Sequence, residues 1–235
     1  MTERRDELAA NLQRVRERID AACADAGRSP EELTLVVVTK FFPASDVALL
    51  ADLGVTDVAE NRHQEAGEKV ASLDPDVRRR LAVHFVGQLQ SNKAAAVTRY
   101  ADVVQSVDRA KIARALDRAA GERDHPLEVT VQVDLSGDDA GRGGVRPADL
   151  PALVEEVAGL EHLRLRGLMA VAPLGADPAP AFDTLAELAE STRRDHPDAT
   201  WMSAGMSGDL EQAIAAGATH LRVGSAILGS RPAQR

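Results

Sequence analysis

The stretch LTLVVVTK (residues 33–40), followed by Phe41-Phe42-Pro43, decides the fold. Its apolar run predicts a buried β-strand, which the proline then ends. The last residue of the run is Lys40. Ligands of parallel α/β proteins bind at the carboxyl ends of the strands, so a lysine at this position is a candidate for chemistry. Its primary amine can form an imine with an aldehyde.

Short apolar runs like this one recur along the whole chain and alternate with segments of helical spacing. The runs are 33–40, 56–60, 82–87, 103–107, 128–134, 163–171, 200–205 and 220–227. The helical segments between them are Pro43–Leu53, Arg62–Leu73, Gln90–Arg99, Arg109–Ala119, Pro147–Ala158, Ala179–Arg194 and Asp209–Ala216. Loops are expected at Gly137–Gly144 and Pro173–Pro180.

Eight strands separated by helices predict an α/β fold, a single (β/α)8 TIM barrel formed by residues 1–235. An additional helix precedes it, over residues 2 to about 26. One face of this helix carries apolar side chains at helical spacing, namely Leu8, Leu12, Val15, Ile19 and Cys23. The alternative is an open doubly wound sheet, which usually has fewer strands at this length.

Composition excludes several classes of protein. Hydrophobic residues make up 44% of the 235 residues and charged residues 28%, which is typical of a globular protein. The net charge of −9 argues against non-specific binding to nucleic acid or to anionic membranes. Cys23 is the single cysteine, and no apolar leader or membrane span is evident. The histidines show no metal-ligand spacing. We therefore expect a cytoplasmic protein.

Two predicted strand ends have the composition of anion sites. The turn from Ser203 to Asp209, SAGMSGD, opens a helix, and the run from Arg222 to Ser225, RVGS, ends the last strand. Glycines allow close backbone approach to a ligand, and helix N-termini offer free N–H donors. Barrels often bind phosphate with the loops after strands seven and eight. The sequence thus predicts a phosphate site beside a reactive lysine.

A phosphorylated aldehyde fits both features, and pyridoxal 5′-phosphate (PLP) is the common one. Arg222 adds a further indication. An arginine has no hydrogen-bond acceptor, so facing the pyridine nitrogen it would keep that nitrogen unprotonated and weaken the cofactor as an electron sink.

Six segments together resemble the pyridoxal-phosphate homeostasis protein family, which is itself similar to the N-terminal barrel of alanine racemase, a PLP protein of fold type III. They are VVVTKFFP (36–43), AENRHQE (59–65), HFVGQLQSNK (84–93), LRGLMAV (165–171), SAGMSGDLEQAI (203–214) and LRVGSAILGSR (221–231). They span nearly the whole chain in the expected order.

The resemblance implies a set of cofactor-binding residues. Lys40 would carry the imine, Arg222 would meet the pyridine nitrogen, and Asn61 and Met206 would lie close to the cofactor. The phosphate would be held by Ser207, Gly208, Gly224 and Ser225. Two positions depart from the family pattern, with Arg62 where a tyrosine is common and Ser225 where a threonine is common. Serine keeps the hydroxyl, so phosphate binding should survive.

Each of these residues also has a structural interpretation. Lys40 could be a solvated strand end, Ser207-Gly208 and Asn61 could cap helices, and Arg222 could pair with a carboxylate such as Glu60.

Three functions are compatible with the sequence. The first is a PLP carrier or regulator in vitamin B6 homeostasis, expected to be monomeric, that holds PLP as an internal aldimine without evident turnover. It could deliver PLP transiently to apo-enzymes. The second is an amino-acid racemase, which would need a second base; Tyr100 is the only tyrosine, and no second domain is expected. The third is a cofactor-free Schiff-base aldolase, with Glu60 or Asp134 moving the proton. The resemblance favours the first.

Overall fold

A closed barrel of eight parallel strands forms the centre of the computed structural model, which describes residues 2–136 and 143–230. The strands are β1 (Thr34–Val38), β2 (Asp57–Glu60), β3 (Ala82–Phe85), β4 (Val103–Val107), β5 (Leu127–Val133), β6 (Leu163–Ala170), β7 (Trp201–Ser203) and β8 (His220–Val223). They pair in sequence order, and β1 closes the barrel against β8, with Thr34 opposite His220 and Val37 opposite Val223. The predicted barrel is confirmed.

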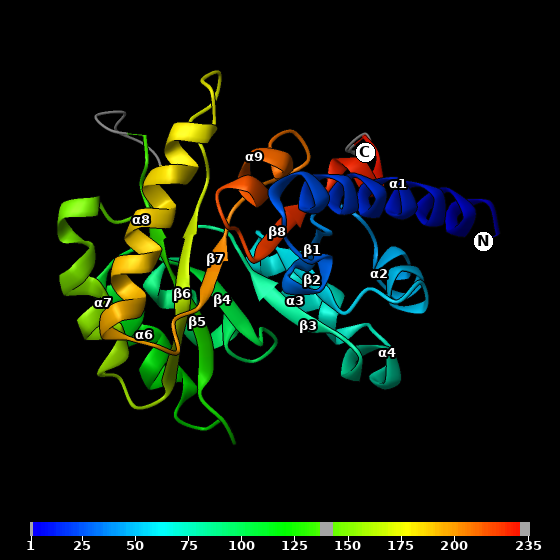
Figure 1. The fold of residues 1–235 in the computed structure, drawn as a ribbon. Coiled ribbons are helices and arrows are strands. Elements are labelled where there is room, and N and C mark those ends of the chain that lie inside the picture. Colours follow the sequence, from blue (N-terminus) through cyan, green and yellow to red (C-terminus); the bar gives the residue numbers. More distant parts are fainter. Residues whose placement is uncertain (1, 137–142, 231–235) are drawn as a thin grey trace.

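Helices surround the strands (Figure 1). They are α1 (Thr2–Ala26), α2 (Ala44–Asp52), α3 (His63–Ala71), α4 (Pro75–Arg79), α5 (Ala94–Val97), α6 (Ala110–Ala120), α7 (Leu150–Ala158), α8 (Ala179–Asp195), α9 (Leu210–Ala215) and α10 (Ser225–Leu228). Three 3₁₀ turns, η1 (Pro30–Glu32), η2 (Ser91–Lys93) and η3 (Pro147–Asp149), complete the connections. Over the residues described, no helix combines the length and apolarity that crossing a membrane requires.

The additional helix at the N-terminus is present as predicted. The five side chains of its apolar face, from Leu8 to Cys23, are all buried. This face packs against α9 and α10, so the first helix lies beside the last elements of the barrel (Figure 1). The helix ends at Ala26, and the next residue, Gly27, has a positive φ of 65° that accompanies a hydrogen bond from the backbone N–H of Arg28 to the carbonyl of Cys23.

Some boundaries differ from the prediction. The last apolar run, 220–227, contains more than a strand: β8 ends at Val223, within the turn predicted over Arg222–Ser225, and residues 225–228 are helical. A short apolar run fits a strand or a buried helix equally well, and Ile227 and Leu228 are buried in the helical form. Helix α4 was not predicted at all. Of the loop predicted at 137–144, residues 137–142 lie outside the described part of the chain.

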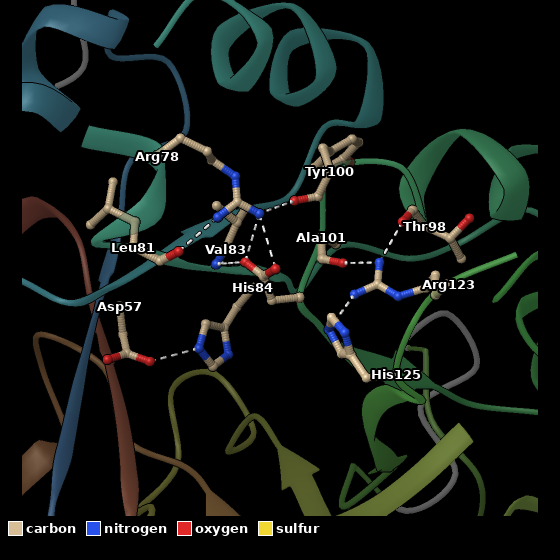
Figure 2. Close-up of polar contacts among 11 residues, drawn as sticks. Asp57, Arg78, Leu81, Val83, His84, Thr98, Tyr100, Ala101, Arg123 and His125 are labelled. Atoms are coloured by element: carbon tan, nitrogen blue, oxygen red, sulfur yellow. Dashed lines mark hydrogen bonds and ion pairs between the residues drawn. The ribbon is translucent and has the colours of Figure 1, made fainter. Parts of the chain in front are cut away.

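Arg78 links two strands at the amino-terminal end of the barrel. Arg78 donates to both carboxylate oxygens of Asp102, and also to the backbone carbonyls of Leu81 and Tyr100 (Figure 2). Asp102 in turn accepts the backbone N–H of Val83. These bonds fix the starts of β3 and β4. The candidate site lies at the opposite end of the barrel, where the strands end.

Candidate functional site

A cavity of about 390 Å³ lies at the carboxyl ends of the strands, where barrels of this class bind ligands. Its lining contains every residue that the sequence resemblance assigned to the cofactor: Lys40, Asn61, Met206, Ser207, Gly208, Arg222, Gly224 and Ser225. These residues come from four separate segments of the sequence, and the barrel brings them together.

Sequence analysis missed other residues of the same lining. They are largely apolar: Val38, Phe41, Phe42, Val86, Gln132, Met169, Val171 and Gly229. All of them except Gln132 fall within the segments that carry the family resemblance, so those motifs held a signal for their place at the site.

The residue after Lys40 has an unusual backbone. Phe41 has a φ of 70°, the left-handed conformation that a bulky side chain rarely adopts. Two contacts hold it. Its N–H donates to Glu65 Oε1 at 2.5 Å, and the guanidinium of Arg62 lies over its ring, 4.6 Å from the ring centre. A strained residue at a functional site persists only where its surroundings fix it, and here it sets the direction in which the chain leaves Lys40.

The residue before Lys40 is held by a buried cation. Lys69 Nζ donates to the carbonyl of Thr39 at 2.8 Å, to Glu60 Oε1 at 2.6 Å and to Glu65 Oε1 at 3.1 Å. Since Glu65 also accepts the N–H of Phe41, this cluster of three charges fixes both neighbours of Lys40. Glu60 is thus the partner of Lys69, and burial still raises its pKa despite that cation.

Arg222 forms the buried floor of the cavity. Its Nη1 donates to Ser203 Oγ at 2.7 Å and its Nη2 to the carbonyl of Ala170 at 2.7 Å. The structural alternative, a pair with Glu60, is wrong, because no carboxylate of the described residues forms an ion pair with this guanidinium. Burial lowers the pKa of Arg222 to about 10, against an opposing effect of Asp209. The guanidinium therefore keeps further N–H donors for a ligand.

A chain of buried hydrogen bonds supports Arg222 through the barrel interior. Ser203 Oγ donates to Gln105 Oε1 at 2.7 Å, and Gln105 Nε2 lies 2.8 Å from His84 Nδ1. His84 Nε2 lies 3.0 Å from Asp57 Oδ1 (Figure 2). Because the amide nitrogen only donates, Nδ1 of His84 must accept and Nε2 must carry the proton. Every bond then points from the cation at the cavity to Asp57 at the other end of the barrel.

His220 on β8 gives this interior a pH dependence. Burial lowers the pKa of His220 from 6.5 to about 3. Between pH 6.5 and about 3, His220 is therefore protonated in the unfolded chain but neutral in the folded chain. The stability that the neutral, buried His220 contributes is present above about pH 6.5 and is lost as the pH falls towards 3. We expect urea unfolding to show a lower free energy of unfolding at pH 5 than at pH 7.5. The decrease should be smaller in His220→Gln, and an equal decrease would contradict the assignment.

The polar end of the cavity consists of hydroxyl groups and a glycine. Ser207 Oγ accepts a hydrogen bond from Ser225 Oγ at 3.3 Å and from the backbone N–H of Ala226 at 3.3 Å. Gly208 beside them leaves open space, since a Cβ there would meet nothing within 4 Å. The sequence argument had relied on helix N-termini, but α9 and α10 span only six and four residues. Hydroxyl and backbone donors therefore matter more here than helix dipoles.

Comparison with known proteins identifies the family to which this chain belongs. A family model for the N-terminal domain of alanine racemase matches residues 4–232. The pyridoxal phosphate homeostasis protein of Escherichia coli K12 is 39% identical over 231 residues, covering 96% of this chain and 97% of that protein. Its namesake in Mycobacterium leprae is 40% identical over 242 residues, covering 97% of this chain and 94% of that protein. The chain belongs to the pyridoxal phosphate homeostasis protein family.

Solved structures agree with membership of this family. PipY of Synechococcus elongatus with PLP bound superposes with a TM-score of 0.81 at 33% identity, covering 94% of this chain and all of that one (100%). A protein of unknown function from Bifidobacterium adolescentis gives 0.91 at 30% identity, covering 97% and 96%. Alanine racemase of Corynebacterium glutamicum gives 0.71 at 16% identity, covering 97% of this chain and 61% of that one, and so shows the shared fold alone.

The residues that the two alternative functions need lie elsewhere. Tyr100, the candidate second base of a racemase, lines a different cavity together with His63, and burial raises the pKa of its hydroxyl. Asp134, a candidate proton carrier for an aldolase, accepts hydrogen bonds from the backbone and side chain of Ser136. The other candidate, Glu60, pairs with Lys69. None of these groups lines the cavity of Lys40.

Proposed function

We propose that this chain binds PLP covalently through Lys40, and that it stores and supplies the cofactor in vitamin B6 homeostasis without catalytic turnover. One observation carries the proposal. The amine of Lys40, the guanidinium of Arg222 and the hydroxyls of Ser207 and Ser225 line a single cavity. The names of the relatives and the PLP bound to PipY support the same conclusion.

The residues of the cavity fit the chemical groups of PLP. When bound, PLP supplies an aldehyde that reacts with amines and a ring that withdraws electrons. Lys40 is the amine for the aldehyde, and Ser207, Gly208, Gly224 and Ser225 are suited to the phosphate. Asn61 Oδ1 is buried without a hydrogen-bond partner, which is the state expected of a group that contacts a ligand.

The lining also accounts for a lack of turnover. Apart from Lys40 and Arg222, the described lining holds no titratable side chain, and in particular no Asp, Glu, His or Tyr. Racemisation needs a second base opposite the lysine, and general acid–base catalysis needs a group within hydrogen-bond reach of the reacting atom. We therefore expect the PLP-loaded protein to leave L-alanine and D-alanine unconverted. Measurable interconversion in a chiral assay would favour the racemase instead.

Arg222 would face the pyridine nitrogen and keep it unprotonated, because a guanidinium donates and does not accept hydrogen bonds. Replacing it by glutamate supplies an acceptor, so Arg222→Glu is expected to favour the protonated ring and shift the visible absorbance of the bound cofactor. The shift is followed by titrating the loaded protein with acid. Arg164→Glu is the control, since Arg164 is exposed at the start of β6. An unchanged spectrum and affinity in Arg222→Glu would show that Arg222 does not contact the pyridine nitrogen.

The proposal also covers the extent of the PLP-binding unit, its compartment, its oligomeric state and its partners. Residues 1–235 act as one PLP-binding unit in the cytoplasm, as a monomer, and pass the cofactor transiently to PLP-dependent apo-enzymes. The match of the family model to residues 4–232 supports the single unit. Mixing the loaded protein with an apo-aminotransferase tests delivery. Activation faster than the release of PLP into buffer would support direct transfer.

A further inference from the structure

A second cavity adjoins the one that contains Lys40. Its volume is about 520 Å³, and Asn61 lines both cavities. One wall is the start of α3, and the other is the segment from Gln88 to Lys93 that follows β3. The second cavity therefore also lies at the carboxyl ends of the strands, the end at which barrels bind their ligands. Its size falls within the range of small-molecule sites.

The second cavity is lined by positive charge although the chain carries a net charge of −9. Arg62 and Lys93 both line it, and neither forms an ion pair with a carboxylate of residues 2–136 or 143–230. The one acidic residue of the lining, Glu65, contacts Lys69, which it shares with Glu60, and accepts the N–H of Phe41. Arg62 and Lys93 still outnumber it. Arg62 stacks on the ring of Phe41 but has no carboxylate partner among the described residues, and the same holds for Lys93. Two such cations in a concave site favour an anionic ligand, such as a carboxylate.

The same cavity also contains polar atoms that lack a donor. Asn61 Oδ1 and His63 Nδ1 are buried without a hydrogen-bond partner. Burial, together with the nearby Lys93, lowers the pKa of His63, so its ring is neutral and one nitrogen can accept. A buried polar atom without a partner is destabilising, so a ligand that donates hydrogen bonds is favoured here. An ammonium group is such a donor.

We propose that this second cavity binds a small α-amino acid, with the carboxylate on Arg62 and Lys93 and the amino group towards Asn61. The inference rests on the proposed function and deepens it, because the amino group would stand beside the cavity of Lys40. The amino acid is then the amine that displaces Lys40. Its nitrogen forms a bond to the aldehyde carbon as the bond from that carbon to Lys40 Nζ breaks. The two protons that the incoming ammonium loses end on Lys40, which leaves as an ammonium.

Titration calorimetry tests the cavity directly. The protein is measured without PLP, and again after loading and borohydride reduction, which makes the bond to Lys40 permanent and prevents displacement. The probes are L-alanine, propionate, ethylamine and inorganic phosphate. We expect L-alanine to bind more tightly than propionate or ethylamine, because only it offers both charged groups. Arg62→Gln with Lys93→Gln should weaken L-alanine binding by about tenfold or more.

Arg164→Gln, at the opposite end of the barrel, serves as the matched control and should leave the binding unchanged. The proposal is overturned if L-alanine does not bind, if phosphate binds more tightly than L-alanine at the same residues, or if the Arg62 and Lys93 variants bind as the wild type does. The proposed function has a separate readout, since reduction either leaves a pyridoxyl group on the protein or does not. L-Alanine binding to the protein without PLP tests the second cavity whether or not a pyridoxyl group forms.

Discussion

Replacing Lys40 by alanine is expected to abolish the covalent attachment of PLP and with it the visible absorbance of the loaded protein. The phosphate and ring contacts proposed for Ser207, Ser225 and Arg222 do not involve the lysine, so weak reversible binding should remain. We expect the affinity to fall by more than about a hundredfold, which corresponds to about 2.7 kcal/mol. Absorbance spectra and equilibrium dialysis measure the two effects separately.

The control for this variant is Lys111→Ala, which removes an exposed lysine from α6. It should bind PLP as the wild type does. The fold should not suffer in either variant, since Lys40 lines a cavity and is not packed in the core. Unaltered absorbance in Lys40→Ala would show that another amine carries the cofactor.

Lys69→Met is expected to have the largest effect on stability. Lys69 and Glu60 form a buried pair, with side chains 6% and 2% exposed. Removing one partner leaves the other charge buried and uncompensated, which costs about 3–5 kcal/mol. It also releases Thr39 and Glu65, and through Glu65 the strained Phe41. We therefore expect lower stability in urea unfolding together with weaker attachment of PLP at Lys40.

The pH dependence of this variant tests the cause. Burial raises the pKa of Glu60 above its ordinary value of 4.5, and Lys69 opposes that increase. A carboxyl whose pKa is higher in the folded state contributes stability at pH values below its unfolded pKa, and this contribution is lost as the pH rises through the folded pKa. Without Lys69, the pKa of Glu60 in the folded protein rises further. The destabilisation by Lys69→Met should thus be smaller at pH 5 than at pH 7.5.

The double variant Lys69→Met with Glu60→Gln is the matched control for the buried charge. It removes both charges, so part of the lost stability should return, and the pH dependence that Glu60 causes should disappear. If the double variant were as unstable as Lys69→Met at every pH, packing rather than the buried carboxylate would explain the loss.

The barrel could be predicted from sequence because each strand is a short apolar run that a helical segment follows. Prediction was weaker where a single run fits two structures, as between Val223 and Leu228, where the strand gives way to α10. Composition and spacing alone indicated a lysine beside an anion site, PLP as an aldehyde that fits both, and Arg222 at the pyridine nitrogen. The full set of cofactor residues, including Asn61 and Met206, came from the resemblance.

The support around the site could not be predicted, because it depends on contacts between distant segments. Lys69 stands four residues after Glu65, a spacing that is typical of a pair on one helix face, yet its amine reaches Glu60 and the carbonyl of Thr39 inside the protein. The hydrogen bonds from Arg222 through Ser203 to the barrel interior likewise join β8 to other strands. Only the closed barrel brings these groups within reach of one another.

The most direct test of covalent PLP binding is borohydride reduction of the loaded protein followed by mass mapping of its peptides. The account predicts a pyridoxyl group on Lys40 and none on Lys69, Lys93 or Lys111, the other lysines of the chain. A pyridoxyl group on one of those lysines in place of Lys40, or no adduct after incubation with PLP, would contradict it.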